Sequence, residues 1–317
     1  MTGGDEAARA WGCLAPPRLI KDRENIVYEI TLPGGARAAL RLHRPGYQTE
    51  AAIRSELWWM KSLAEAGLPV PRPIPAANGD LVVGADGRWA TVVTWVDGEQ
   101  FGDGATPLGP DSGTVERRFR ALGGVIARMH DATDRLVRPQ GFERPSWDST
   151  GFLGEAPLWG RFWENPALSE EEQSLLARAR DGAARALARH EAEQVDYGLI
   201  HADVLRENVL VRDESIALID FDDCGFGFRA YDLATAEVQG LEDPLNPLAG
   251  LALYEGYKAV RRRDAPRLGD VTLFVALRCF ASAGWIISRA APGDPRMRFY
   301  AERAVRAARR LVSGEAA

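Results

Sequence analysis

The residues best suited to chemistry lie in one stretch, LIHADVLRENVLVRDESIALIDFDD, from Leu199 to Asp223. Asn208 follows Asp203 after a short polar loop, and Asp220 comes just past the second of two apolar runs. A carboxylate can take the proton of an acceptor hydroxyl, while an amide and a second carboxylate hold Mg²⁺ on nucleotide phosphates. The types and spacing of these three side chains therefore predict phosphoryl transfer.

Two short strands must position these side chains. The pattern predicts strands at Val209–Val211 and Ile216–Ile219, joined by a polar turn at Arg212–Ser215. Such a hairpin brings the loop before its first strand and the residues after its second strand to the same rim. An ordinary hairpin with a solvated acidic turn would show a similar pattern, because polar residues beside apolar strands are common.

Four short motifs stand out in and after this stretch: His201-Ala202-Asp203, Asn208, Ile219-Asp220-Phe221-Asp222-Asp223 and Tyr231-Asp232-Leu233-Ala234. Together they resemble the catalytic signature of the aminoglycoside phosphotransferase and choline kinase-like family, and they are closest to its homoserine kinase-like and stress-response Ser/Thr kinase-like branch. Most members have Gly where this chain has Ala202, and the extra methyl does not remove the neighbouring carboxylate. The resemblance implies an α+β, bilobal protein-kinase-like fold, with a small antiparallel-sheet N-lobe and a mostly helical C-lobe.

The resemblance assigns a role to each polar residue of the catalytic stretch. Asp203 is expected to orient the acceptor hydroxyl and take its proton, and His201 to brace the loop. Asn208, Asp220 and Asp222 are expected to ligate Mg²⁺, a hard cation that prefers oxygen. The implied cofactors are ATP and Mg²⁺, and GTP in place of ATP is compatible with the same residues. In the last motif, the buried carboxylate is expected to order the catalytic loop through hydrogen bonds.

The N-terminal part predicts a sheet followed by a helix, with strands at 18–21, 27–32 and 36–42 and the helix at 49–66. Alternation along the third strand places Arg41 on the face opposite to Leu40 and Leu42. In the family, Arg41 falls where a cation grips the α- and β-phosphates, and Glu56 where a glutamate pairs with that cation. A surface arginine with no partner and a solvated glutamate are the ordinary alternatives, and Glu50 lies on a similar helix face.

The strand that ends at Val96 resembles the hinge between the lobes in this family. Backbone groups of Thr94, Trp95 and Val96 are expected to hydrogen-bond the adenine edge, and Leu210 is expected to form part of the floor under the ring. A central strand that ends in a plain turn would have the same sequence, because the backbone makes these bonds. The expected lobes are residues 1–96, a nucleotide-binding sheet plus helix, and residues 97–317, with the catalytic loop and acceptor-binding helices.

The C-terminal part predicts mainly helices, at 114–130, 169–190, 229–239, 247–262, 267–289 and 295–312. His130 ends the first of them and is expected to be packed or capping rather than catalytic. Trp147, Trp159 and Trp163 lie in an irregular aromatic segment, 139–168. This segment either roofs the acceptor pocket or packs under a long loop.

Composition limits the classes of partner and compartment. The 317 residues have a net charge of −6, which argues against nucleic acid or a basic membrane surface and is compatible with a cationic acceptor. Three widely separated cysteines suggest a reducing compartment, and the N-terminus lacks a signal-peptide pattern, so we expect a cytoplasmic protein. The apolar run Val271–Ser288 is interrupted by Arg278, which favours a buried helix over a membrane span.

These patterns favour an ATP- and Mg²⁺-dependent O-phosphotransferase that acts on a small hydroxylated acceptor, such as an amino alcohol, an amino acid or an aminoglycoside. A Ser/Thr protein or peptide kinase is the alternative that the branch similarity suggests. A non-catalytic nucleotide-binding module is a third, although a pure binder has no need of a proton acceptor such as Asp203. The sequence indicates neither the acceptor nor the oligomeric state.

Overall fold

The computed structural model describes residues 3–193, 195–261, 265–291 and 293–313. Its contacts divide the chain into two compact units. Unit 1 consists of Met1–Glu99, Arg135–Arg144 and Leu210–Asp222, and unit 2 of Gln100–Asp134, Pro145–Val209 and Asp223–Ala317. The sequence suggests a boundary after residue 96, whereas the contacts also assign most of the 209–219 hairpin to unit 1.

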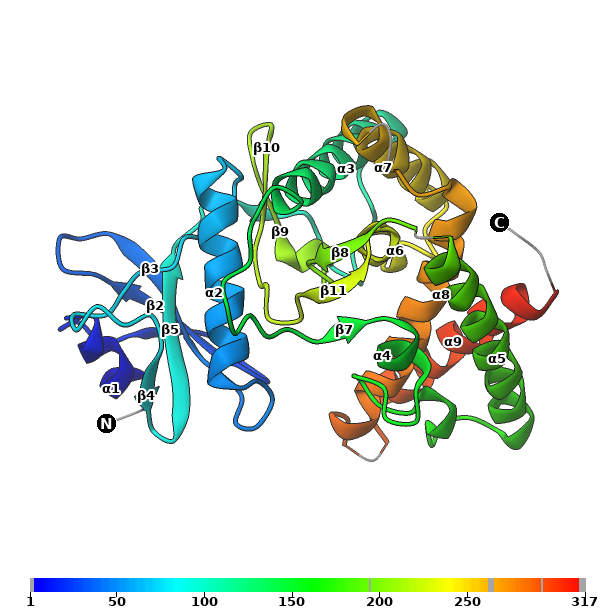
Figure 1. The fold of residues 1–317 in the computed structure, drawn as a ribbon, viewed down its shortest axis with the longest axis horizontal. Helices are drawn as coiled ribbons and strands as arrows, with labels where there is room; N and C mark the ends of the chain where they lie inside the picture. The colour runs from blue at the N-terminus through cyan, green and yellow to red at the C-terminus, as the bar shows by residue number, and fades with distance from the viewer. Residues whose placement is uncertain (1–2, 194, 262–264, 292, 314–317) are drawn as a thin grey trace. The chain divides into compact units, whose positions relative to one another are not determined.

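Unit 1 is built on an antiparallel sheet with the strand order β1-β2-β3-β5-β4 (Figure 1). The three predicted N-terminal strands and the predicted helix are present, while the first helix was not predicted. The elements up to the end of this sheet are α1 (Gly3–Ala10), β1 (Arg18–Asp22), β2 (Ile26–Thr31), β3 (Arg37–Leu42), α2 (Glu50–Glu65), β4 (Val83–Ala85) and β5 (Arg88–Thr94).

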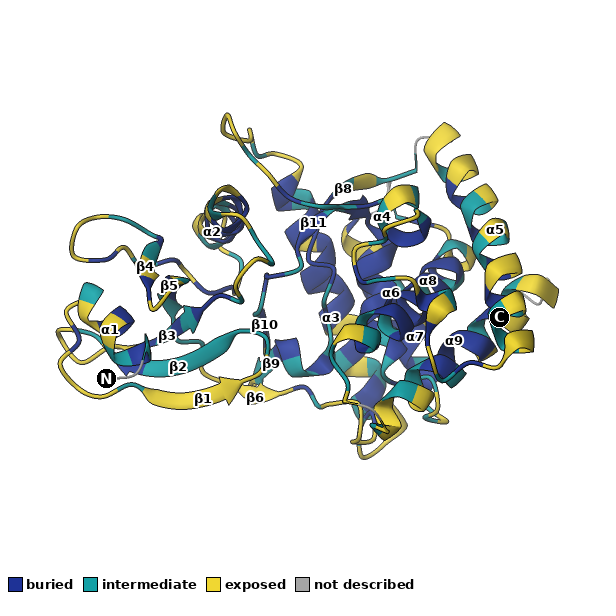
Figure 2. Cartoon of the chain, turned by 90° about the horizontal axis from the view of Figure 1, so that it is seen from below, coloured by how far each residue is buried: buried dark blue, intermediate teal, exposed yellow. Residues whose placement is uncertain are grey.

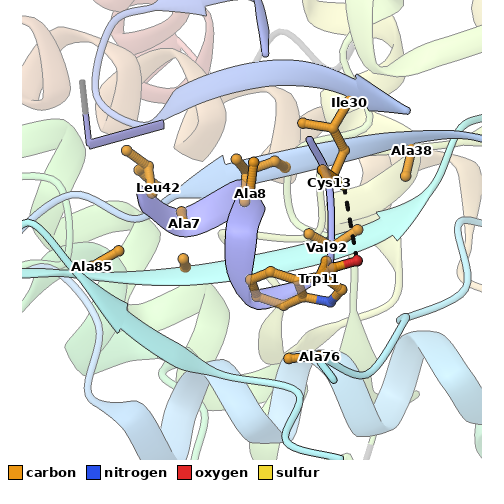
Figure 3. Packing of buried hydrophobic residues seen from close by; sticks show 12 residues of the cluster. Ala7, Ala8, Trp11, Cys13, Ile30, Ala38, Leu42, Ala76, Ala85 and Val92 are labelled. Atoms are coloured by element: carbon orange, nitrogen blue, oxygen red, sulfur yellow. Dashed lines mark hydrogen bonds between the residues drawn. The ribbon is translucent and has the colours of Figure 1, made fainter. Parts of the chain in front are cut away.

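The two faces of β3 differ in polarity. Leu40 and Leu42 are buried in an apolar cluster with Ala7, Ala8 and Trp11, which belong to α1 and the turn after it (Figure 3). Burial of each leucine side chain stabilises the sheet by roughly 1.5–3 kcal/mol. Because side chains alternate along a strand, the opposite face of β3 carries its polar residues away from this cluster. The predicted division of faces is therefore confirmed.

The helix α2 begins and ends where its sequence signals predict. The Thr49 hydroxyl accepts a hydrogen bond from Ala52 N at 3.0 Å, which caps the helix. Gly67, just beyond the other end, has φ 85°, a left-handed conformation that glycine adopts without strain. Ile53 and Leu57 are buried on the stripe that holds the helix against its unit.

A hairpin of β9 (Val209–Arg212) and β10 (Ser215–Leu218) follows the catalytic loop. In unit 1, Leu218 N donates to Pro69 O at 3.1 Å. Phe221 is buried with its ring centroid 5.4 Å from that of Trp59, in an edge-to-face contact. These contacts anchor the segment that carries Asp220 and Asp222 within unit 1.

Unit 2 is mainly helical, and the described ends of its predicted helices lie close to their expected positions. The short strand β6 (Glu99–Gln100) spans the point where the chain enters it. Its other elements are α3 (Ser112–Thr133), β7 (Ser146–Trp147), α4 (Ser149–Leu153), η1 (Phe162–Glu164), α5 (Glu170–Ala192), β8 (Tyr197–Ile200), η2 (Arg206–Asn208), β11 (Gly225–Phe228), α6 (Ala230–Val238), α7 (Asn246–Val260), α8 (Leu268–Trp285), η3 (Ile286–Ser288) and α9 (Pro295–Ser313).

Glycines set two of the close approaches in unit 2. A Cβ added to Gly123 in α3 would lie 1.9 Å from Leu253 O in α7, so these helices approach as only glycine allows. In β11, which pairs with β7 and β8, a Cβ on Gly225 would lie 2.4 Å from Pro145 O. The strand β11 was not predicted. The contact with Pro145 explains why position 225 is a glycine rather than a residue with a Cβ.

The helix α8 is the central apolar element of unit 2. By length and composition, Leu268–Ser288 could cross a membrane, but 67% of its most apolar window is buried inside the protein. It packs against α6 and α9, and Figure 2 shows α6 and α8 mostly buried while α5 exposes one side. The structure therefore agrees with the predicted buried helix.

Candidate active site

Asp203 and Asn208, both in unit 2, lie side by side. The Asn208 amide donates to Asp203 Oδ2 at 2.8 Å and to Asp203 O at 3.0 Å. The short helix η2 supplies the turn that brings the two residues together. Because the amide nitrogen faces Asp203, the amide oxygen is directed elsewhere and keeps its capacity to accept or to ligate.

The loop before Asp203 is held in an unusual backbone conformation. Ala202 has φ 64°, in the left-handed region that favours glycine. His201 N and Ala202 N donate to the two oxygens of Asp232, at 2.9 and 2.7 Å, and Asp203 N donates to His201 Nδ1 at 3.3 Å. Asp232 thus orders the loop before Asp203 through the expected hydrogen bonds, and the φ angle at position 202 is one that glycine would adopt without strain.

A buried histidine, His130, also contacts the Asp232 carboxylate. His130 lies between Asp232 Oδ2, 3.0 Å from its Nε2, and the Tyr257 hydroxyl, 2.8 Å from its Nδ1. Burial lowers the pKa of His130 well below its ordinary value, so the ring is neutral at neutral pH. Burial also raises the pKa of the Asp232 carboxyl. His130 is therefore a packed residue, as predicted.

Arg278 of α8 is a contact of Asp203 that sequence reasoning missed. Its Nη2 donates to Asp203 Oδ1 at 2.8 Å and its Nη1 to Ala202 O at 3.1 Å. The available signal was the charge itself, because Arg278 interrupts an otherwise apolar helix. Its partner lies 75 residues away in the chain, a separation that periodicity does not reveal.

Unit 1 brings together Arg41, Glu56 and Asp220. Arg41 Nη1 lies 3.0 Å from Glu56 Oε1, and its Nη2 lies 2.7 Å from Asp220 Oδ1. Glu50 instead pairs with Arg54, one turn along the same helix, at 2.7 Å. Of the two glutamates considered from the sequence, Glu56 is therefore the partner of Arg41.

Burial and neighbouring charges shift the pKa values of this cluster in opposite directions. Burial lowers the pKa of the Arg41 guanidinium, but the charges of Asp220, Glu56 and Asp222 outweigh it, so the net shift is upward. Burial raises the pKa of the Glu56 carboxyl to about 7 despite the opposing charge of Arg41. Arg41 therefore stays cationic, which its predicted role in phosphate binding requires.

Asp222 is fixed by residues that the sequence did not reveal. Asn25, in the turn between β1 and β2, donates to Asp222 Oδ2 at 2.9 Å, and Gln48 donates to Asp222 O at 3.2 Å. Arg144 also donates to Asp222 O. The contact with Asn25 joins the loop after β10 to the turn between β1 and β2 within unit 1.

The residues predicted to hold magnesium offer the oxygen donors that this cation prefers. Asp222 Oδ1 is buried and has no hydrogen-bond partner among the described residues, and a cation would satisfy it. The Asp220 side chain is 34% exposed and is paired with Arg41 through one oxygen. Asn208 belongs to the other unit, so its place in the same ligand set stays a prediction.

The expected adenine-binding segment follows β5 in unit 1. Thr94 N donates to Arg72 O at 2.8 Å and Trp95 N donates to Arg37 O at 3.4 Å. Of the three residues whose backbone groups are predicted to bond adenine, Val96 is the one whose N–H has no such bond among the described residues. Leu210 lies beside this segment, because a Cβ on Gly98 would be 3.1 Å from Leu210 Cβ.

From Pro145 onward, the aromatic segment 139–168 belongs to unit 2. Trp147, Phe152 and Trp159 are buried, and the ring of Trp147 is stacked on that of Tyr231 with centroids 5.5 Å apart. Of the two roles considered, aromatic packing is the one that these contacts demonstrate. Arg278 lies over Trp159, with Cζ 4.5 Å from the ring centroid, so the segment also reaches the surroundings of Asp203.

A cavity of about 1030 Å³ lies elsewhere in unit 2, among α5, α8 and α9. Cys279 lines this cavity, whereas the preceding residue, Arg278, contacts Asp203. None of the described residues predicted for the active site lines it. The cavity and the carboxylate therefore lie on different faces of α8.

Comparisons with known proteins show which family the chain belongs to. The model of the phosphotransferase enzyme family matches residues 17–267. A homoserine kinase from Sinorhizobium fredii (strain NBRC 101917 / NGR234) is 29% identical over 243 residues, which are 73% of this chain and 68% of that protein. The chain thus spans about two thirds of the length of this relative.

Solved structures show the same fold. A microcompartment-associated aminopropanol kinase superposes with a TM-score of 0.83 at 31% identity, over 98% of this chain and 97% of that chain. An amicoumacin kinase in complex with AMP-PNP and Ca²⁺ superposes with a TM-score of 0.71 at 20% identity, over 95% and 89%. The predicted fold class is confirmed. By its sequence, its fold and the enzymes it resembles, the chain belongs to the phosphotransferase enzyme family.

Proposed function

We propose that this chain is an ATP- and Mg²⁺-dependent kinase that moves the γ-phosphate to the hydroxyl of a small amino alcohol. The homoserine kinase and the aminopropanol kinase that resemble it are named for acceptors that carry both an amino group and a hydroxyl. The net charge of −6 is compatible with a cationic acceptor of this kind. ATP is the proposed donor, in keeping with the AMP-PNP bound to the amicoumacin kinase.

The observation that carries the proposal is the fixed carboxylate of Asp203. One oxygen accepts from Asn208 and the other from Arg278, each at 2.8 Å. The transition state of phosphoryl transfer is loose and asks little of a strong base, so positioning carries most of the catalysis. A carboxylate held in this way can orient the acceptor hydroxyl and take its proton late in the reaction.

The other residues take the roles predicted for them. Arg41, held by Glu56, would grip the nucleotide phosphates, and His201 would brace the loop. Asn208, Asp220 and Asp222 would hold Mg²⁺, which neutralises phosphate charge when it is bound. The adenine would meet the backbone of Thr94, Trp95 and Val96 above Leu210.

Measured ADP release across a panel of acceptors tests the proposal. The panel includes homoserine, 1-amino-2-propanol, ethanolamine, an aminoglycoside and casein, each with Mg²⁺ and ATP. We expect turnover with at least one small amino alcohol. Turnover with casein alone would favour the protein kinase alternative, and ATP binding without turnover on any acceptor would favour the non-catalytic module.

The Asp203→Asn variant tests the role of the carboxylate. It keeps the shape of the side chain but removes the proton acceptor, so turnover should fall by at least ~10²-fold while nucleotide binding persists. Asp213→Asn, in the exposed turn between β9 and β10, is the matched control and should retain full turnover. Equal turnover in both variants would contradict the assignment of Asp203.

A further inference from the structure

Arg278 is the charged residue among the buried residues of α8, which are otherwise apolar, small or glycine. Its side chain is 4% exposed. A buried charge costs several kcal/mol unless it is paired and hydrogen-bonded, so a cation at this position is expected to have a specific partner. That partner is the catalytic loop.

The guanidinium holds two oxygens of this loop at once. Nη2 reaches the Asp203 carboxylate at 2.8 Å and Nη1 reaches the Ala202 carbonyl at 3.1 Å. Asn208 holds the other carboxylate oxygen. Because each carboxylate oxygen of Asp203 accepts a hydrogen bond and Arg278 also binds the neighbouring Ala202 carbonyl, the carboxylate has little freedom to rotate.

An aromatic support holds the guanidinium in turn. Its Cζ lies 4.5 Å from the ring centroid of Trp159, a cation–π geometry. Trp159 meets Trp147 edge to face with centroids 5.0 Å apart, and Trp147 stacks on Tyr231. The planar group is therefore fixed by a ring on one side and by two oxygens at its edge, an arrangement that arginine allows and lysine does not.

We propose that Arg278 is a positioning residue for phosphoryl transfer, which fixes the Asp203 carboxylate in the orientation that meets the acceptor hydroxyl. The inference rests on the proposed kinase function for its kinetic consequence. A purely structural role, in which Arg278 only neutralises a buried carboxylate, requires the charge but not the forked geometry. Lysine can therefore replace arginine in the neutralising role but not in the positioning role.

Steady-state kinetics of Arg278→Lys separate these roles. Lysine keeps the charge, so the neutralising role predicts unchanged turnover. The positioning role predicts that kcat falls about 10- to 100-fold while KM for ATP stays the same, because small misplacements of a reacting group cost rate rather than nucleotide affinity. Arg180→Lys is the matched control, since Arg180 also lies over a tryptophan, Trp163, at 4.0 Å, and also holds a carbonyl and a carboxylate, and it should leave kcat unchanged.

A double-mutant cycle tests whether Arg278 acts through Asp203. In the Asp203→Asn background, Arg278→Lys should lower kcat little further, because the group that it positions is already lost. The same fold loss in both backgrounds would overturn the proposal. Thermal unfolding of each variant checks that it is folded, and lysine is chosen because it avoids leaving the carboxylate without a cation.

Crystal structures of the wild type and Arg278→Lys give a readout that does not depend on activity. We expect the Asp203 carboxylate to rotate from its position, or to be disordered, in the variant. An unchanged and ordered Asp203 would overturn the positioning role even in an enzyme whose acceptor is unknown. Failure of the wild type to transfer phosphate would instead overturn the proposed function, and the structural comparison would still decide the role of Arg278.

Discussion

At the scale of single residues, Ala202 shows how the catalytic loop stores strain. Its left-handed backbone lets two successive N–H groups, those of His201 and Ala202, reach the oxygens of the buried Asp232 carboxylate. An L-residue in this conformation costs roughly 1–2 kcal/mol. The hydrogen bonds to Asp232 outweigh that cost, so the chain tolerates alanine at this position.

Ala202→Gly should therefore change stability little. Relief of the backbone strain gains about 1–2 kcal/mol, but loss of the buried methyl costs about 0.8 and the added freedom of glycine in the unfolded chain about 0.5–1 kcal/mol. Urea denaturation should place the variant within about 1 kcal/mol of the wild type. Ala234→Gly, equally buried but within α6, is the control and should lose about 2 kcal/mol. Equal losses in both would refute the strain argument.

The sequence predicted those site residues whose position follows from the local periodicity of a strand or helix. Alternation put Arg41 on its face of β3, the family resemblance paired it with Glu56, and that ion pair is present. Asn25 and Arg278 were not predicted, because their partners lie 197 and 75 residues away in the chain. A polar side chain whose role depends on such a distant partner gives no periodic signal.

At the scale of elements, apolar periodicity predicted most helices and the N-terminal strands. The α1 helix was missed because it is short and its buried residues are mostly alanine and glycine, which carry a weak apolar signal. The strand β11 was missed because Gly225-Phe226-Gly227-Phe228 has low strand propensity. Its glycines are required by close backbone and side-chain contacts, which are properties of the folded protein rather than of the segment.

The α6–α7 pair contains a carboxyl group that makes stability depend on pH. Burial raises the pKa of Glu237 to about 7 from an ordinary value of 4.5, against a weak hydrogen bond from Asn246. The folded state thus favours the protonated form. Its contribution to stability is complete below the ordinary pKa and is lost as the pH rises through about 7.

Glu237→Gln should remove this dependence, since the amide is neutral at every pH. We expect the variant to gain stability over the wild type between about pH 5 and about pH 8, by up to about 3 kcal/mol. Urea denaturation at both pH values measures the difference. Glu214→Gln, in the exposed turn after β9, should show no such trend. A difference between Glu237→Gln and the wild type that stays constant across this range would show that Glu237 is not the group that titrates.

At the scale of the whole molecule, the chain passes between its two units more than once. Residues 135–144 and 210–222 belong to unit 1 although their neighbours in sequence belong to unit 2. The pattern of the hairpin predicted its strands but not its unit, because Leu218 and Phe221 find their partners near Pro69 and Trp59. Asp203 and Asp220, which are close in sequence, are therefore anchored by different units.

In the proposed function, Asp220 of unit 1 holds the metal and Asp203 of unit 2 takes the proton of the acceptor, and the thermal stability of the protein can test these two roles separately. A ligand that binds the folded state at 100 times its Kd stabilises it by about 2.7 kcal/mol. We expect Mg²⁺ and AMP-PNP together to raise the melting temperature of the wild type and of Asp203→Asn by several degrees, and EDTA to abolish the shift. Asp220→Asn should lose most of it, because its loss of charge weakens metal binding while asparagine tolerates the φ of 66° at this position. An undiminished shift in Asp220→Asn, or a lost shift in Asp203→Asn, would show that these two carboxylates do not divide the work as proposed.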